Sequence, residues 1–333
     1  MIIKSIDLTN FRSHDHYHLD CKDQTSLILG PNGCGKTSVL EGIYLLTRGK
    51  SFRATDPDII KRGTTFYRSH LEYTNGEETL ATYDNKEKIF QVAGKKSKRL
   101  PAKSKYPVVL FLPSDLNLIS HAPSRRRDYF DTIFGGYDDN YASALSKYKK
   151  ALRQRSELLK DEAVTREQLF SWNLLLARYG AFLASSRAKY IAEINSLLTP
   201  TYHSIAENAD HINIDYRTDT DVLAEDRYLK TLENNFARDH LLGHTTFGVH
   251  RDDYLFNFNS RPADGSASRG ETRSIILSLK FIEADLSEKY LGKKPLILLD
   301  DVFSELDETR RQALVTNFIN HQVIITSTDG GIM

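Results

Sequence analysis

A glycine-rich segment near the start of the chain has the residue types and the spacing of a phosphate-binding loop. Its eight residues match the pattern GxxxxGK[ST] and are Gly30, Pro31, Asn32, Gly33, Cys34, Gly35, Lys36 and Thr37. Glycines let the backbone wrap closely around a phosphate, and a helix that starts there offers unpaired N–H donors. In such a loop the lysine reaches the β- and γ-phosphates and the threonine hydroxyl holds Mg²⁺. We therefore expect ATP and Mg²⁺ as ligands of this segment.

The sequence on either side supplies the elements that such a loop needs. The apolar run 26–29 predicts a short buried strand before the loop, and 37–46 has the spacing of an amphipathic helix after it. A glycine-rich turn before an ordinary helix is the simpler explanation of the eight residues. The strand and the helix together favour the phosphate-binding loop.

Two carboxylates follow a second buried strand near the end of the chain. The apolar run 295–299 predicts the strand, and Asp300 and Asp301 come directly after it. In P-loop ATPases a Walker B strand ends in an aspartate that holds Mg²⁺. We expect Asp300 to share Mg²⁺ with Thr37, and Asp301 to act as the general base that activates water. Alone, the pair also fits a strand that ends in a polar turn.

A third motif predicts that one ATP site is built by two subunits. Ser268, Arg269, Gly270 and Glu271 open a helix about 30 residues before the acid pair. As four residues they fit a helix cap, but before a Walker B strand they resemble the signature motif of ABC-type ATPases. The segment 304–307 resembles the D-loop of the same class. In that class the signature serine and glycine act across a dimer interface, so we expect an ATP-dependent homodimer with Ser268 and Gly270 acting in trans.

Composition bounds the class of protein. The chain has 333 residues, of which 40% are hydrophobic and 27% charged, with a net charge of +1. No run approaches the roughly 20 apolar residues of a membrane span, and 1–5 lacks the apolar core of a signal peptide. Of the two cysteines, Cys34 lies in the phosphate loop, where a disulfide would obstruct the turn. We expect a reduced, cytoplasmic protein without a membrane partner.

Hydrophobic periodicity predicts an α/β fold with a helical insertion. We expect an ABC-type ATPase head, with a P-loop sheet and a flanking β-meander, formed by 1–112 plus 245–333, and a mostly helical arm inserted at 113–244. Helices are predicted at 140–160, 166–198, 270–290 and 307–319. Further strands are predicted at 2–11, 67–73, 78–83, 88–92, 108–112, 211–216, 254–258 and 323–326.

The ordered series of motifs resembles the RecF family of bacterial recombination-mediator ATPases. It comprises 8–13, 50–53, 111–116, 123–131, 248–253, 268–271 and 300–307, and it covers essentially the whole chain. The resemblance implies a dimer that clamps duplex DNA near single-strand gaps when ATP is bound. It also implies slow DNA-stimulated ATP hydrolysis and work with RecR and RecO to load RecA. Family analogy alone brings Arg12 toward the phosphates.

The residues themselves support DNA binding in part. Three basic clusters fit sequence-independent contacts to phosphates, and each fits a solvated face equally well. They are Lys95, Lys96, Lys98, Arg99, Lys103 and Lys105; Arg125, Arg126 and Arg127; and Lys147, Lys149, Lys150, Arg153 and Arg155.

Three histidines near the start of the chain have a simpler explanation than a metal site. His14, His16 and His18 alternate, and a solvated strand face explains them better than a metal site does.

The alternative class of protein is an SMC-type head for chromosome tethering, which carries coiled coils of hundreds of residues. The helical stretch of the insertion, about seventy to ninety residues long, argues against it.

Overall fold

The computed structural model describes residues 2–21, 23–206, 208–219 and 223–328, and the chain divides into two compact units. The first unit comprises Met1–Asp115 and Glu283–Met333, and the second comprises Leu116–Ile282. The second unit contains most of the arm predicted at 113–244 and extends further along the chain. It does so because the strand at 253–258 pairs with the strand at 212–217. The assignment of one unit as an ATPase head and the other as its arm stays a prediction.

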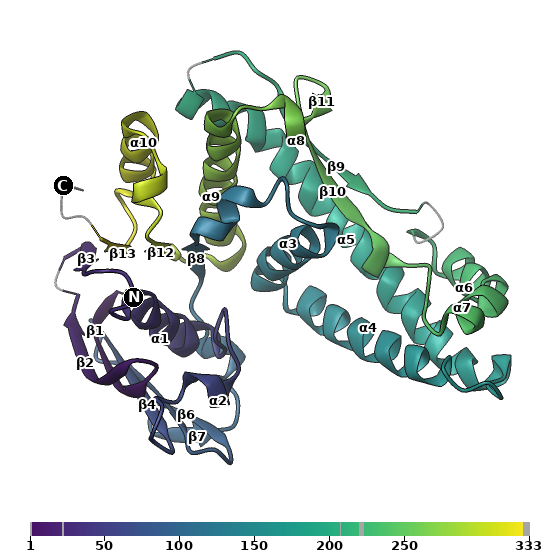
Figure 1. Ribbon diagram of the computed structural model, residues 1–333, viewed down its shortest axis with the longest axis horizontal. Coiled ribbons are helices and arrows are strands. Elements are labelled where there is room, and N and C mark those ends of the chain that lie inside the picture. Colours follow the sequence, from purple (N-terminus) through teal and green to yellow (C-terminus); the bar gives the residue numbers. More distant parts are fainter. Residues whose placement is uncertain (1, 22, 207, 220–222, 329–333) are drawn as a thin grey trace. The chain divides into compact units, whose positions relative to one another are not determined.

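A four-stranded parallel sheet joins the two ends of the chain in the first unit. Its order is β3 (Thr25–Leu29), β13 (Val323–Ser327), β12 (Leu296–Asp300) and β8 (Val108–Phe111) (Figure 1). Every residue of β12 and β13 is buried, as expected for central strands of a parallel sheet. Because parallel strands end at the same edge, the loop after β3 and the acids at the end of β12 lie together.

Helix α1 (Lys36–Arg48) connects this sheet to a second one. Its apolar side chains, among them Val39, Leu40 and Ile43, share one core cluster with Ile6 and Leu8. The helix approaches the second sheet closely at Gly42, where an added Cβ would stand 2.6 Å from a methyl of Leu8. This close packing fixes the start of α1, and with it the phosphate loop.

The second sheet is antiparallel and six-stranded. Its order is β2 (His14–Asp20), β1 (Ile3–Phe11), β4 (Tyr67–Tyr73), β5 (Glu78–Tyr83), β6 (Lys88–Val92) and β7 (Lys95–Ser97). The predicted meander is confirmed by β4, β5 and β6. The basic cluster at 95–105 begins in a strand, β7, because Lys95 to Ser97 pair with Val92 to Phe90. The remaining elements of this unit are α2 (Asp56–Ile59), η1 (Ala102–Ser104), η5 (Phe303–Glu305) and α10 (Glu308–Phe318), and η2 (Pro113–Asn117) spans the boundary to the second unit.

Long helices dominate the second unit. They are α3 (Pro123–Tyr137), α4 (Asp139–Leu158) and α5 (Arg166–Ala206), followed by the short α6 (Glu225–Asn234) and α7 (Phe236–Leu242). A three-stranded sheet lies beside α5 and has the order β11 (Arg261–Pro262), β10 (Asp253–Phe258), β9 (Ile212–Arg217) (Figure 1). The unit also contains η4 (Val249–Arg251) and α8 (Ala263–Ser266), and α9 (Arg269–Leu291) runs from it into the first unit. No helix in the described ranges is long and apolar enough to cross a membrane.

Helix α5 continues past the predicted end at 198 and through Pro200. Its last turns are tied to strand β9 by two side chains that stand one turn apart. Asn195 exchanges two hydrogen bonds with the backbone of Ile214, and Thr199 exchanges two with the backbone of Ile212. These bonds satisfy the free edge of β9 and add tertiary support to a helix that a proline alone would end.

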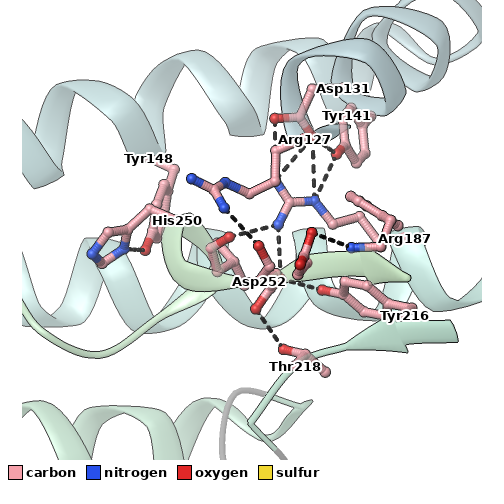
Figure 2. Close-up of polar contacts among 12 residues, drawn as sticks. Arg127, Asp131, Tyr141, Tyr148, Arg187, Tyr216, Thr218, His250 and Asp252 are labelled. Carbon is pink, nitrogen blue, oxygen red and sulfur yellow. Dashed lines mark hydrogen bonds and ion pairs between the residues drawn. The ribbon is translucent and has the colours of Figure 1, made fainter. Parts of the chain in front are cut away.

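A buried arginine organises the second unit. Arg187 on α5 is 2% exposed, and its guanidinium reaches Asp131 on α3 at 2.9 Å and Asp252 at 2.8 Å (Figure 2). It also donates to the carbonyl of Val249 at 2.7 Å. One side chain thus joins two helices to the segment that enters β10, which gives the motif at 248–253 a structural role.

The same motif is held from its other sides as well. Asp252 accepts hydrogen bonds from the hydroxyls of Tyr216 and Thr218, and its carbonyl accepts one from Arg127 at 2.7 Å (Figure 2). Asp253 forms a two-bond ion pair with Arg126, with distances of 2.8 and 2.7 Å. The buried carboxylate of Asp252 and the partly buried one of Asp253 therefore both have hydrogen-bond partners, as is usual in folded proteins.

His250 of this motif should make the second unit sensitive to acid. Its Nε2 lies 3.0 Å from the carbonyl of Thr245 and its Nδ1 lies 2.8 Å from the hydroxyl of Tyr148. A carbonyl only accepts, so Nε2 carries a proton. Burial, helped by the charges of Arg251 and Arg127, lowers the pKa of His250 to about 4. In the unfolded chain the histidine has an ordinary pKa of about 6.5. Between the two pKa values the unfolded chain therefore binds a proton that the folded state does not bind.

We therefore expect the contribution of His250 to the free energy of unfolding to be at its full value above about pH 6.5. It should be lost as the pH falls toward 4. The loss amounts to roughly 3 kcal/mol, at 1.36 kcal/mol per pKa unit. Urea unfolding followed by the fluorescence of Trp172, the single tryptophan, measures it. His250→Gln should flatten the dependence between pH 6.5 and 4.5, whereas exposed His244→Gln should leave it as in the wild type. Equal slopes for wild type and His250→Gln would refute the assignment.

Candidate phosphate site

The loop at 30–37 has a backbone that only glycine adopts easily. Gly33 and Gly35 have φ angles of 84° and 101°, in the region that side chains disfavour. Gly35 also has no room for a side chain, because an added Cβ would collide with His14 and Ser13. His14 in turn contacts the Gly35 carbonyl at 3.1 Å through its Nε2. The turn between β1 and β2 therefore braces the outside of the loop.

Lys36 is held over the loop. Its ammonium donates to the carbonyls of Gly30 at 2.9 Å and Pro31 at 3.3 Å. The carboxylate of Asp301 lies 3.6 Å away. The side chain of Lys36 is only 4% exposed, so its charge is concentrated where the loop would enclose a phosphate.

Thr37 and Asp300 come together although they are 263 residues apart in the chain. The Thr37 hydroxyl lies 2.8 and 3.0 Å from the two carboxylate oxygens of Asp300. Asp300 also accepts a hydrogen bond at 2.9 Å from Thr326, which lies on the neighbouring strand β13. A hydroxyl and a carboxylate are oxygen ligands of the kind that Mg²⁺ prefers, so this donor set fits the predicted metal.

Asp301 stands at a backbone position that few residues adopt. Its φ is 49°, a left-handed conformation that aspartate and asparagine tolerate better than most side chains. Its N–H lies 3.0 Å from the hydroxyl and 3.2 Å from the carbonyl of Thr326. Thr326 therefore orients both acids of the pair. This role could not be predicted from sequence, where Thr326 has the pattern of one residue in a buried strand.

An open cavity of about 900 Å³ lies at the phosphate loop in the first unit. Lys36, Thr37 and Asp301 form one part of its wall, and Arg12 and Arg53 another. The other lining residues are Ser13, Asn32, Gly33, Gly35, Ser38, Pro57, Asp58, Ile60, Lys61 and Arg62. The wall is rich in cations and N–H donors, which suits an anionic ligand with several phosphates.

Ser268 and Gly270 belong to the second unit, at the start of α9. The Ser268 N–H donates to the Glu271 carboxylate at 2.6 Å, and the Ser268 hydroxyl lies 3.3 Å from the Glu271 N–H. This reciprocal pair is a capping box. Ser268 is exposed and Gly270 is partly exposed. Both residues therefore stay accessible at the surface, as a signature motif would require, although they also cap the helix.

Two of the predicted phosphate-binding arginines are buried in ion pairs. Arg126 is 8% exposed and pairs with Asp253, and Arg155 is fully buried against Asp239 at 2.7 Å, with Asn173 and Thr245 as further partners. Their inclusion in the basic clusters was therefore wrong. The members of the 95–105 cluster are all exposed, as are Arg125, Lys147, Lys149, Lys150 and Arg153.

His16 and His18 agree with the prediction of a solvated strand face, whereas His14 is partly buried and contacts the phosphate loop. His16 and His18 are exposed on β2, and His18 contacts Asp7 at 2.7 Å and Asp20 at 3.1 Å. No group of three or more histidine, cysteine or acidic side chains with metal-binding geometry occurs in the described part of the chain. Cys21 and Cys34 are both free thiols.

Comparisons with known proteins agree with this architecture. A family model described as an AAA ATPase domain matches residues 1–239. The protein "DNA replication and repair protein RecF" of Agathobacter rectalis is 34% identical over 338 residues, which cover 98% of this chain and 92% of that protein. The protein of the same description from Ruminiclostridium cellulolyticum is 31% identical and covers 99% and 93%.

Solved structures place the fold in the same group. A structure of the recombination mediator protein RecF-ATPrS in the RecFOR pathway matches with a TM-score of 0.88 and 28% identity, over 99% of this chain and 93% of that one. An SMC head bound to the C-winged helix domain of ScpA matches with a TM-score of 0.54 and 12% identity, over 100% and 91%, which shows a shared fold alone. The chain folds as an α/β P-loop ATPase of this kind and belongs to the RecF family of DNA replication and repair proteins.

Proposed function

We propose that this chain is an ATP-dependent DNA-binding dimer that acts in recombinational DNA repair and in the maintenance of replication forks. The observation that supports it best is that Lys36, Thr37 and Asp301 line one cavity, with Asp300 hydrogen-bonded to Thr37, in a member of the RecF family. The solved relatives carry ATP or ATPrS by description. A protein that acts on replicating bacterial DNA would lie in the cytoplasm.

Each group of the site has one proposed role. The loop from Gly30 to Gly35 encloses the phosphates with its N–H groups, and Lys36 neutralises the β- and γ-phosphates. Thr37 and Asp300 would hold Mg²⁺, which would offset the charge of the phosphates. Asp301 takes a proton from the attacking water. Ser268 and Gly270 of the partner subunit complete the site, so hydrolysis would require a dimer.

We infer that the partners are duplex DNA near single-strand gaps and the other proteins of the RecFOR pathway, including RecR and RecO, which together load RecA. The exposed lysines and arginines at 95–105 support contacts to phosphates rather than to bases. Binding should therefore weaken steeply with salt and vary little with DNA sequence. ATP hydrolysis, slow and stimulated by DNA, would release the clamp.

Sedimentation velocity of the purified chain tests this proposal. With ATP and Mg²⁺ we expect a dimer, and with gapped duplex DNA added we expect the dimer alone to co-sediment with it. Lys36→Ala should stay monomeric and leave the DNA unbound. Dimers that form equally without ATP, or DNA binding by the monomer, would contradict the ATP-dependent clamp.

A further inference from the structure

A buried carboxylate next to the phosphate cavity holds two arginines at once. Glu41 lies on α1, one turn after Thr37, and its side chain is fully buried. One of its oxygens accepts from the Nε of Arg12 at 2.9 Å and the Nε of Arg53 at 3.0 Å. The other accepts from the Nη2 of Arg12 at 2.8 Å and from the hydroxyl of Ser51 at 2.6 Å.

The cluster keeps Glu41 ionised and leaves an excess positive charge. Burial alone would raise the pKa of Glu41, but the hydrogen bonds from Arg12, Ser51 and Arg53 outweigh it and the pKa is lowered. One carboxylate then faces two guanidinium groups, both of which line the cavity. Two like charges on one acceptor repel each other, and an anion in the cavity would relieve that repulsion.

The two arginines differ in what they have left to offer. Arg12 uses all three of its nitrogens, because its Nη1 donates to the carbonyl of Asp58 at 2.7 Å. Arg53 uses Nε and Nη2, the latter also toward the Ser38 hydroxyl at 3.2 Å. Among the described residues its Nη1 has no hydrogen-bond partner. The Arg53 side chain is 37% exposed, against 22% for Arg12.

We propose that Glu41 is a positioning residue that presents the unbonded edge of Arg53 to the phosphates of the nucleotide. Arg12 holds the carboxylate of Glu41 in place through its hydrogen bonds. Two N–H donors of a planar guanidinium suit two phosphate oxygens. Held on one side by Glu41 and Ser38, Arg53 loses little conformational freedom when the nucleotide binds. The proposal rests on the proposed ATP-binding function and adds to it a residue that acts only through another.

A double-mutant cycle tests the coupling between the two residues. The variants are Glu41→Gln, Arg53→Gln and both together, and the measurement is the Kd of ATP with Mg²⁺ by titration calorimetry. We expect each single variant to raise the Kd about ten-fold or more, the range of hydrogen bonds to charged groups. The double variant should bind no more weakly than Arg53→Gln alone. Losses that multiply in the double variant would overturn the proposal, because Glu41 would then act independently of Arg53.

Two controls separate this inference from the function on which it rests. Arg68→Gln removes an exposed arginine of β4 in the same unit that is not among the residues lining the cavity, and it should leave the Kd unchanged. Lys36→Ala should abolish binding whether or not Glu41 has this role. If the wild type and Lys36→Ala both fail to bind ATP, the proposed function fails. If Lys36→Ala alone loses binding and Arg53→Gln binds like Arg68→Gln, only the present inference fails.

The test remains decisive if Glu41→Gln does not fold. Arg53 is a partly exposed residue, so its replacement should leave the melting temperature near that of the wild type. A ten-fold weaker affinity in folded Arg53→Gln, against none in Arg68→Gln, supports the role of Arg53. Arg53→Lys should recover part of the affinity, since it keeps the charge but not the planar pair of donors.

Discussion

Asp301→Asn should abolish ATP turnover while leaving ATP binding intact. A general base contributes about 10² to 10⁴ in rate, so we expect kcat to fall by that factor. Asparagine has the shape of aspartate but does not take up a proton at neutral pH. It also tolerates the φ of 49° at this position, so the substitution adds no backbone strain. Single-turnover hydrolysis and equilibrium binding of ATP, measured on the same sample, separate the two effects.

The contrast with Lys36→Ala makes this result specific. That variant should lose affinity, because it removes the cation that lies against the phosphate loop. Asp301→Asn removes a negative charge 3.6 Å from the same lysine, so its affinity for ATP should stay equal or rise. A variant that binds but does not hydrolyse should also accumulate as the ATP-bound dimer. Hydrolysis by Asp301→Asn at the normal rate would remove Asp301 from the role of base.

The parts of the site that lie close in sequence could be predicted, and the parts built by distant contacts could not. The phosphate loop depends on glycines and a lysine within eight residues, and the acid pair follows a strand that reads as buried from its apolar run alone. The predicted strands likewise indicated one sheet built from both ends of the chain, as found.

Glu41 shows why the rest was missed. An acid in an amphipathic helix has the pattern of a surface residue, and its partners Arg12 and Arg53 lie 29 and 12 residues away. The same limit explains the error in the basic clusters. Arg126 and Arg155 look like their exposed neighbours, and the acids that bury them are 127 and 84 residues away. The local sequence shows which residues are charged, but the fold determines which charged residues form ion pairs.

Removal of the Arg187 side chain should strongly destabilise the second unit. Arg187→Met keeps much of the volume but leaves Asp131 and Asp252 buried without their shared cation. Breaking a buried ion pair from one side costs about 3–5 kcal/mol. Urea unfolding followed by Trp172 fluorescence measures it, because Trp172 lies on the same helix, α5. Arg178→Met, an exposed arginine on that helix, should change the free energy of unfolding by less than about 0.5 kcal/mol.

The pH dependence of the deficit distinguishes lost charge pairing from lost packing. Burial already raises the pKa of Asp252, and Arg187 opposes that rise. Without Arg187 the pKa of Asp252 should climb further, and the folded variant would then bind a proton that the unfolded chain, at a pKa of about 3.9, does not. Such a raised pKa favours the folded state as the pH falls toward it. The difference between wild type and Arg187→Met should therefore be larger at pH 8 than at pH 5. A deficit of the same size at both values would mean that Arg187 stabilises the unit through packing rather than through its charge.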